Sequence, residues 1–418
     1  MALHIVANRP DPALVSLPWS TPLAEWTDDF VVPLPRGLSR HIVRIVRLGE
    51  RTYAIKETQE EIAFREYRLL RDLQRIGLPA VKPLGVVTGR EDEHGEALPC
   101  ALLTEHLAFS LPYRALFAHG MTAENLPSLV DALVVLLVRL HLSDFYWGDV
   151  SLSNVLFRRS AGGFAAYLVD AETGELRPSL SRQMREYDVQ VGCENVFAEL
   201  LDLQAGGRIS SSVQGHEIVA LIQKRYDDLW SELTAEEEFS TDEMWRIEQR
   251  IERLNELGFD VDELDIVTDF DGASVRMRPK AVEAGHHQRE LQALTGLCVE
   301  DGQARRLLND LTSFIAHFHL GGEDRAIAAN LWLTDIFEPI MEMVPPEARE
   351  KLEPAEIFHE ILVHRWYLSE RAGHEIGILD TARDYIDTVL TSKPDELVAA
   401  DESEVMSLPE EDQDASVL

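Results

Sequence analysis

Short runs of β-branched and aromatic residues, separated by turn residues, dominate the first hundred positions and predict a β-rich unit. The strand-like runs are residues 30–32, 41–48, 52–56, 81–88 and 99–105. Residues 60–76 differ, because they contain no Gly or Pro and repeat apolar positions at helical spacing. The pattern therefore predicts five strands and one helix. Residues 1–27, with four prolines and two tryptophans, predict an irregular arm packed on the surface.

The pattern becomes mainly helical in the second part of the chain. Residues 126–142 are so apolar that they predict a helix buried on most sides. Residues 172–185, with two turn formers and three arginines, predict a loop. Residues 264–267 and 274–278 predict a small β-hairpin. Further helical patterns occupy residues 188–203, 212–257, 288–320 and 354–390.

The predicted helix 60–76 carries a carboxylate inside its apolar stripe. Around Glu66, apolar residues stand at positions −4, +3, +4 and +7. An unpaired buried charge is costly, so Glu66 needs a partner. Lys56, at the end of an apolar strand, is the candidate. The alternative is that Glu66 lies at the edge of the stripe and reaches water.

Three polar residues flank a predicted hairpin. Asp149 and Asn154 lie five residues apart before one β-type run, and Asp170 ends the next run. Turn residues at 160–163 bring Asp170 back beside Asn154. Converging oxygen ligands beside another carboxylate suit a Mg²⁺–phosphate site with an adjacent base. Each residue alone is more typical of a turn, but the combination favours the chemical site.

A second set of residues would support these three. The helix predicted at 188–203 carries Asn195 and Glu199 on one face. Asp188, at its start, either anchors the loop around Asp149 from beneath or simply caps the helix.

A nucleotide would need an adenine site as well as a phosphate site. Glu105-His106-Leu107 follows the last predicted strand of the first unit. As the connection between two lobes, this segment would offer the backbone of Glu105 and Leu107 to the base.

Composition limits the classes of partner. The chain has 418 residues, 45% hydrophobic and 27% charged, which suits a soluble protein with more than one domain. Its net charge of −35 argues against nucleic acid or an anionic membrane as partner. Three cysteines show no metal-ligand spacing and are expected to be reduced. With no secretory signal pattern and an apolar run of only 133–138, we expect a cytoplasmic, not membrane-spanning, protein.

One segment departs from the negative charge. Residues 36–75 hold ten basic and six acidic residues, a local excess of four positive charges. The excess is consistent with a phosphate-binding surface and equally with a solvated helix face. The segment has no glycine-rich phosphate loop, so we predict that Arg36, Ser39 and Arg40 bind phosphate through their side chains.

The candidate residues follow, in order, the pattern of protein-kinase-like enzymes: Lys56, Glu66, Asp149, Asn154 and Asp170. The chain most resembles the lipopolysaccharide-kinase and small-molecule-kinase branch of that fold. Together with the five candidate residues, the segments 147–154 and 169–176 also make the chain similar to the actinobacterial DUF4032 family. That family combines a kinase-like region with a C-terminal domain of its own.

The resemblance implies an α+β, two-lobed protein-kinase-like fold. A β-rich N-lobe and a helical C-lobe would precede a mainly helical C-terminal domain with a small β-hairpin. Nine carboxylates without Lys or Arg predict a disordered acidic tail at the end. The predicted divisions are an arm at 1–27, the N-lobe at 28–107, the C-lobe at 108–257, the C-terminal domain at 258–393 and the tail at 394–418.

The resemblance also implies an ATP- and Mg²⁺-dependent phosphotransferase. Lys56, fixed by Glu66, would bind nucleotide phosphates; Asn154 and Asp170 would bind Mg²⁺. Asp149 would accept the proton of the attacking hydroxyl.

The chain departs from the usual kinase pattern at two points besides the missing glycine-rich loop. Trp147 replaces the usual His, and Ala171-Glu172 replaces the usual Phe-Gly. The short segment after Asp170 favours a small-molecule or lipid-like acceptor over a protein. The rival interpretation is a kinase-shaped module that binds a nucleotide or a partner without turnover.

Overall fold

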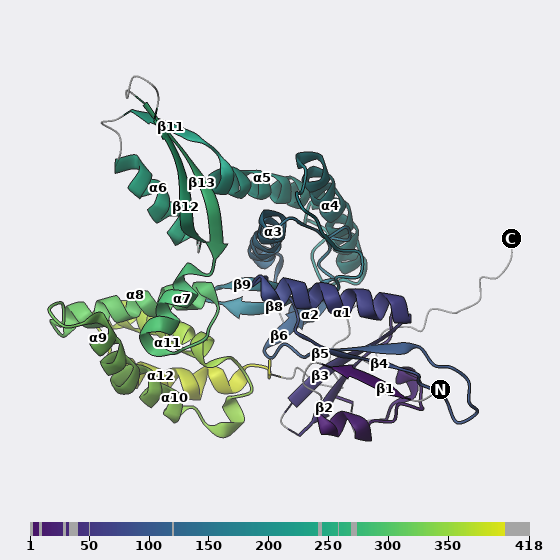
Figure 1. Ribbon diagram of the computed structural model, residues 1–418. Coiled ribbons are helices and arrows are strands. Elements are labelled where there is room, and N and C mark those ends of the chain that lie inside the picture. Colours follow the sequence, from purple (N-terminus) through teal and green to yellow (C-terminus); the bar gives the residue numbers. More distant parts are fainter. Residues whose placement is uncertain are drawn as a thin grey trace.

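The computed structural model describes residues 3–7, 11–27, 31–32, 41–49, 51–118, 121–240, 245–257, 259–268 and 274–397. It has an α+β, two-lobed kinase-like architecture followed by a largely helical C-terminal domain (Figure 1). The fold class predicted from the sequence is therefore confirmed.

The N-lobe is a five-stranded antiparallel sheet with one helix on it. The strand order is β1-β4-β5-β3-β2. The bounds are β1 (His4–Ala7), β2 (Val43–Leu48), β3 (Arg51–Thr58), β4 (Pro83–Thr88), β5 (Cys100–Glu105) and helix α1 (Glu60–Arg75). The apolar stripe of α1 lies in the main hydrophobic core. The pairing of β3 with both β2 and β5 places Lys56 in the middle of the sheet.

The N-terminal arm is more regular than predicted. Residues 4–7 form β1, the edge strand beside β4. Trp19 and Trp26 are buried in a cluster on the outer face of the sheet. The buried Arg90 donates to Glu57 at 2.7 Å and to the Trp19 and Thr21 carbonyl groups. Two short 3₁₀ helices, Pro12–Ser16 and Leu23–Glu25, complete the arm.

The C-lobe is built around α3 (Leu126–Leu142), which is buried as predicted. Its other elements are β6 (Ser110–Pro112), α2 (Tyr113–Ala118), β7 (Phe145–Tyr146), β8 (Val155–Ser160), β9 (Gly163–Leu168), β10 (Glu175–Leu176), α4 (Arg182–Ala205) and α5 (Gly215–Thr234). Strands β6, β8 and β9 form one small sheet, and β7 pairs with β10. By length and composition the helix at Ala123–Leu142 could cross a membrane. Here it packs in the core of the C-lobe.

Two predicted boundaries in the C-lobe were wrong. Residues 172–185 are not a continuous loop, because they contain β10 and the first turn of α4. Ser181 caps that turn by accepting a hydrogen bond from the Met184 amide. Residues 212–257 are not uniformly helical either, since β11 (Glu237–Ser240) separates α5 from α6 (Trp245–Glu256). The acidic run around Glu237 therefore lies at the start of a strand.

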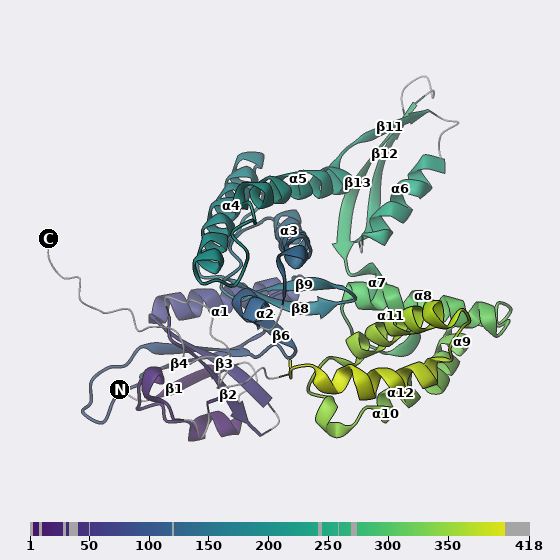
Figure 2. The ribbon, with the colours of Figure 1, turned by 180° about the vertical axis from the view of Figure 1, so that it is seen from behind.

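The C-terminal domain begins with a three-stranded sheet, β11-β13-β12, in place of a simple hairpin. Strands β12 (Phe259–Thr268) and β13 (Ser274–Ala284) are followed by α7 (His286–Thr295), α8 (Asp301–His317), α9 (Arg325–Trp332), a π-helical turn (Leu333–Phe337), α10 (Glu338–Met343), α11 (Pro354–Ala372) and α12 (Ile378–Thr388). Helices α9 and α10 lie outside the helical patterns predicted from the sequence. In Figures 1 and 2 the helices form a bundle beside the β8–β9 hairpin.

The molecule has separate hydrophobic cores. One core joins α1, the C-lobe helices and the central strands, and another lies within the helical bundle from α7 to α12. The beginning of the predicted acidic tail is ordered, because Glu396 is buried and binds Arg159. Residues 398–418 lie outside the described residues.

Candidate active site

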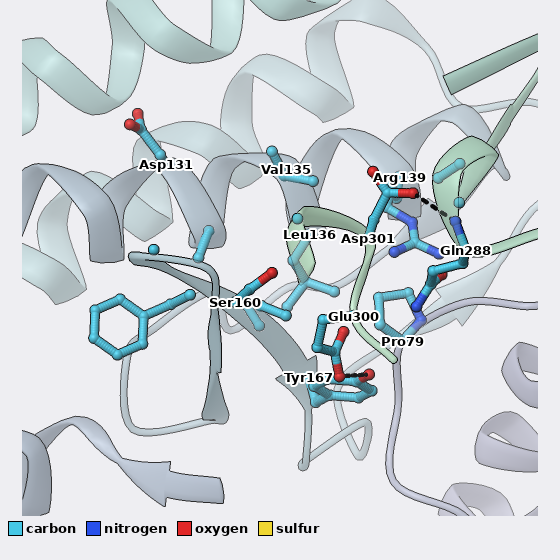
Figure 3. Close-up of a pocket in the computed structure, with 18 of the residues that line it drawn as sticks. Pro79, Asp131, Val135, Leu136, Arg139, Ser160, Tyr167, Gln288, Glu300 and Asp301 are labelled. Atoms are coloured by element: carbon cyan, nitrogen blue, oxygen red, sulfur yellow. Dashed lines mark hydrogen bonds between the residues drawn. The ribbon is translucent and has the colours of Figure 1, made fainter. Parts of the chain in front are cut away.

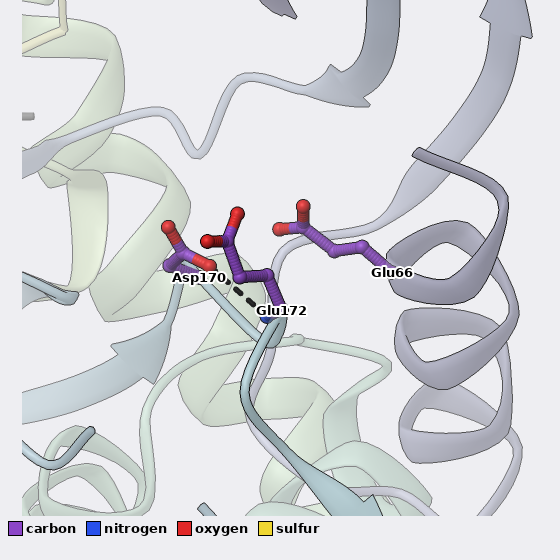
Figure 4. A group of neighbouring side chains, drawn as sticks. All are labelled: Glu66, Asp170 and Glu172. Carbon is purple, nitrogen blue, oxygen red and sulfur yellow. Dashed lines mark hydrogen bonds between the residues drawn. The ribbon is translucent and has the colours of Figure 1, made fainter. Parts of the chain in front are cut away.

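Lys56 is the meeting point of the candidate site. Its Nζ lies 3.0 Å from Glu66 Oε2, 2.9 Å from Asp170 Oδ2 and 3.4 Å from Glu172 Oε2. The Lys56–Glu66 ion pair expected from the helical pattern is thus present. It forms because Glu66 lies on the buried face of α1, which packs on β4 and β5, and β5 pairs with the strand β3 that carries Lys56. The three carboxylates approach each other from α1 and from the segment after β9 (Figure 4).

Burial and charge oppose each other at these groups. Burial raises the pKa of Glu66 to about 7, while Lys56 lowers it and Asp170 raises it. Burial disfavours the ammonium of Lys56, but Glu66 and Asp170 together raise its pKa above the ordinary value. Three carboxylates around one ammonium leave an excess of negative charge. The cluster is therefore suited to a divalent cation.

Glu172 is the site residue that the sequence analysis missed as a ligand. Glu66, Asp170 and Glu172 offer oxygen atoms that all lie within 4.8 Å of one another. His41, just before β2, also reaches Glu172, with 2.9 Å between Nε2 and Oε2. The sequence does contain one indication of this role, because Asp170-Ala171-Glu172 places a second carboxylate two residues after the first.

The loop before β8 holds Asp149 and Asn154 together. The Asn154 amide donates to the Asp149 carbonyl at 3.0 Å and to Asp149 Oδ2 at 3.1 Å. Because only the amide nitrogen can donate these bonds, Asn154 Oδ1 remains as the ligand atom. Asn195 on α4 donates to the second carboxylate oxygen of Asp149 at 3.3 Å. Both contacts fix the orientation of the Asp149 carboxylate.

Helix α4 anchors this loop from beneath. Asp188 accepts the Trp147 and Gly148 amides, both at 2.8 Å, which decides in favour of the anchoring role. Eleven residues later, Glu199 accepts the Leu152 and Ser153 amides at 2.9 and 2.8 Å. Two carboxylates on one helix therefore satisfy the backbone on both sides of Asp149.

A buried histidine completes the anchor. His141 Nε2 lies 3.1 Å from Asp188 Oδ2, and Nδ1 lies 2.7 Å from the Tyr226 hydroxyl. Since the carboxylate only accepts, Nε2 carries the proton and Nδ1 accepts from Tyr226. Burial lowers the pKa of His141, which keeps the ring neutral.

A cleft of about 510 Å³ lies between the lobes beside these groups. Lys56, Asn154 and Asp170 line it, together with the connection between the lobes. Its size is in the range of small-molecule sites. Arg36, Ser39 and Arg40, predicted to bind phosphate, lie outside the described residues.

In the connection between the lobes, two of the three backbone amides bond within the protein, and the roles of Glu105 and Leu107 stay predictions. The Glu105 amide donates to the Lys82 carbonyl at 2.8 Å and the His106 amide to the Thr52 carbonyl at 3.0 Å, so neither is available to a base. Among the described residues, the Leu107 amide has no hydrogen-bond partner. Of the two predicted residues, Leu107 is thus the one that offers a backbone donor in the cleft.

Comparison with protein families gives two matches. Residues 44–191 match the lipopolysaccharide kinase (Kdo/WaaP) family, and residues 228–390 match a domain of unknown function, DUF4032. Together the two matches identify a kinase-like protein with a DUF4032 region. Both resemblances seen in the sequence are confirmed, while an actinobacterial origin stays a prediction.

The DUF4032 match begins within α5, and the kinase match includes all five candidate residues named from the sequence. One similar solved structure is WaaP in complex with acyl carrier protein, with 14% identity and a TM-score of 0.30. The similarity covers 55% of this chain and 100% of that chain. No match was found among curated proteins.

Proposed function

We propose that this protein is an ATP- and Mg²⁺-dependent phosphotransferase acting on a hydroxyl group. One observation carries the proposal: Lys56 and Asp170 line one cleft together with Asn154, while Glu66 contacts Lys56 and the Asn154 amide orients the Asp149 carboxylate. Phosphoryl transfer depends mainly on positioning and charge neutralisation, and these groups can supply both.

The residues present fit a magnesium nucleotide. Asp170 and Glu172 provide carboxylate oxygens and Asn154 provides an amide oxygen, which are the ligand types that Mg²⁺ accepts. The metal would neutralise charge on the phosphates. Lys56 would then exchange part of its contact with Asp170 for a phosphate oxygen while Glu66 keeps it in place. The Leu107 amide would donate to the base.

Asp149 would act on the acceptor. Its carboxylate would accept the proton of the acceptor hydroxyl as the oxygen bonds to the γ-phosphorus and the bond to ADP breaks. The contacts from Asn154 and Asn195 hold the carboxylate in one orientation, which favours this step.

The acceptor is proposed to be a small or lipid-like molecule. The segment that follows Asp170 is short and fixed: Thr173 donates to the Trp147 carbonyl, Arg65 donates to the Gly174 carbonyl, and β10 pairs with β7. It offers no extended platform for a peptide. With ATP as donor, we expect the reaction to take place in the cytoplasm.

The test is a transfer assay with γ-labelled ATP and fractionated cell metabolites and lipids. We expect label in an acceptor only when Mg²⁺ is present, and none with Lys56→Met. The rival is a module that binds nucleotide without turnover, favoured by the missing glycine-rich loop. Mg²⁺-dependent ATP binding without hydrolysis or transfer in any fraction would support the rival and contradict the proposal.

A further inference from the structure

The β8–β9 hairpin determines where two of the proposed metal ligands stand. Asn154 directly precedes β8, and Asp170 follows β9 by two residues. The Val169 amide donates to the Asn154 carbonyl at 3.1 Å, and Val155 pairs with Leu168. A displacement of the hairpin would therefore move Asn154 and Asp170 relative to Lys56, which belongs to another lobe.

The C-terminal domain binds the middle of this hairpin through buried charges. Arg158 on β8 contacts Glu300 at 2.9 Å and Glu353 at 2.5 Å. Tyr167, on the neighbouring strand, donates to Glu300 at 2.7 Å (Figure 3). Glu300 therefore links both strands to α8. Glu300 and Glu353 occupy the N-cap positions of α8 and α11, so two helices of the bundle direct carboxylates at one arginine.

The tip of the hairpin is held in the same way. The Ala161 amide donates to Glu356 at 3.0 Å, and Gln303 donates to Glu356 and to the Arg159 carbonyl. Helix α8 also approaches the hairpin closely, because a Cβ on Gly302 would lie 2.7 Å from Ser160 Oγ and 3.1 Å from the Ser160 carbonyl oxygen.

These contacts are polar rather than a continuation of an apolar core. The hydrophobic cores of the kinase-like region and the helical bundle are separate. A cavity of about 530 Å³ lies beside the interface, lined by α3, β9 and the start of α8, with Tyr167 and Glu300 on its wall (Figure 3). Among the described residues, the hairpin and the bundle belong to different apolar cores, so the charged contacts are the ones that connect the bundle to the hairpin.

We propose that the DUF4032 region positions the metal site, with Glu300 and Arg158 as the main positioning residues. The inference rests on the proposed function and gives the C-terminal domain a role in it. Glu300 touches neither nucleotide nor acceptor in this arrangement. It acts on Asn154 and Asp170 through the hairpin.

The decisive variant is Glu300→Gln, which keeps the shape and removes the charge. We expect the apparent affinity for Mg²⁺ at saturating ATP to fall about tenfold or more, as for residues that orient metal ligands. Binding of ATP in EDTA should be unchanged. Arg158→Met should show the same selective loss. The Arg158→Met/Glu300→Gln double variant should lose little more than either single variant, since the residues act as one unit.

Two controls separate positioning from simple loss of stability. Glu347→Gln removes an exposed charge from the same domain, away from the hairpin, and should change nothing. Leu311→Ala opens a void in the core of the bundle and should lower Tm without changing the Mg²⁺ dependence of the folded protein. Hydrogen exchange should be faster within residues 154–170 in Glu300→Gln and unchanged there in Glu347→Gln.

The outcomes distinguish the two proposals. If the wild-type protein binds ATP with Mg²⁺ and Glu300→Gln binds Mg²⁺ equally well, the positioning role is wrong and the proposed function stands. If the wild-type protein shows no Mg²⁺-dependent ATP binding, the proposed function fails and the positioning role fails with it.

Discussion

At the scale of single residues, the candidate site contains side chains whose orientation is fixed by their contacts and side chains that can exchange one partner for another. Asp149 is oriented by Asn154 and Asn195, and its loop is anchored by two buried carboxylates of α4. Lys56, by contrast, has three carboxylate partners, of which only Glu66 comes from its own lobe. The proposed base is therefore held in one orientation, whereas Lys56 has partners that it could exchange for a phosphate oxygen.

Asp149→Asn tests the role of the base. The variant keeps the side-chain shape and removes the proton acceptor, so we expect the transfer rate to fall by about 10²- to 10⁴-fold. ATP affinity should remain nearly unchanged, because the carboxylate faces the acceptor. Asp170→Asn should instead weaken Mg²⁺-dependent binding and turnover together. A transfer rate for Asp149→Asn within about twofold of wild type, far below that range, would rule out the proposed role.

His141 predicts a pH dependence of stability. Its pKa in the folded protein lies below the ordinary value of 6.5 because the ring is buried. Below that pH the unfolded chain takes up a proton that the folded protein excludes. The free energy of unfolding should therefore fall as the pH drops through 6.5.

Denaturant titrations between about pH 8 and pH 5 would measure this effect. His141→Gln should be less stable at high pH but should depend less steeply on pH. His216→Gln, at an exposed position, serves as the control and should keep the wild-type slope. Equal slopes for His141→Gln and wild type would contradict the assignment.

At the scale of elements, α4 supports the loop that carries Asp149. Its residues Asp188, Asn195 and Glu199 all contact the segment 147–153. Between them stands Gly192, where a Cβ would lie 2.8 Å from Val150 Cγ1. The helix can approach the loop this closely only because the residue has no side chain. Val150 directly follows Asp149, so packing at Gly192 bears on the base.

Gly192→Ala should therefore damage both stability and activity. Inserting a methyl group into a tightly packed contact typically costs about 1–3 kcal/mol. The displaced Val150 should also lower the transfer rate while the Lys56 side of the site stays intact. Gly206→Ala, where the nearest atom would be 3.4 Å away, is the matched control and should stay within about 0.5 kcal/mol of wild type. Equal stability and rate for the two variants would refute this account of α4.

At the scale of the whole molecule, the site exists only where several parts meet. Lys56 and Glu66 belong to the N-lobe, and Asp149, Asn154 and Asp170 belong to the C-lobe. The C-terminal domain holds the hairpin between the last two. A ligand that contacts both lobes should consequently stabilise the assembly, and protein ligands alone should bind Mg²⁺ weakly.

Thermal unfolding tests this expectation. Mg²⁺ with ATP should raise the free energy of unfolding by about 2.7 kcal/mol at a hundredfold excess over Kd. Mg²⁺ alone should have little effect, because the phosphates complete its coordination. Lys56→Met should lose most of the stabilisation while remaining folded. Stabilisation by Mg²⁺ alone equal to that by Mg²⁺ with ATP would contradict the assignment of a nucleotide-dependent metal.

The sequence by itself determined the parts of this protein that depend on local patterns. The helical stripe around Glu66 identified a buried carboxylate, and the paired β-type runs between Asn154 and Asp170 identified the hairpin. Both depend on periodicities of a few residues, which are properties of the local sequence and do not require contacts with distant segments. The buried helix at 126–142 was evident for the same reason.

Only the tertiary structure decided the contacts between distant segments. Nothing near Glu172 indicates that His41 will reach it from 131 positions away. The local sequence does not predict the edge strand at 4–7, because its partner β4 lies far along the chain. It does not predict the contact between Glu396 and Arg159 either, because only packing brings these two residues together. Glu300 shows this most clearly, since its own surroundings mark it as a helix cap. Its link to the β8–β9 hairpin arises when the bundle packs against the C-lobe.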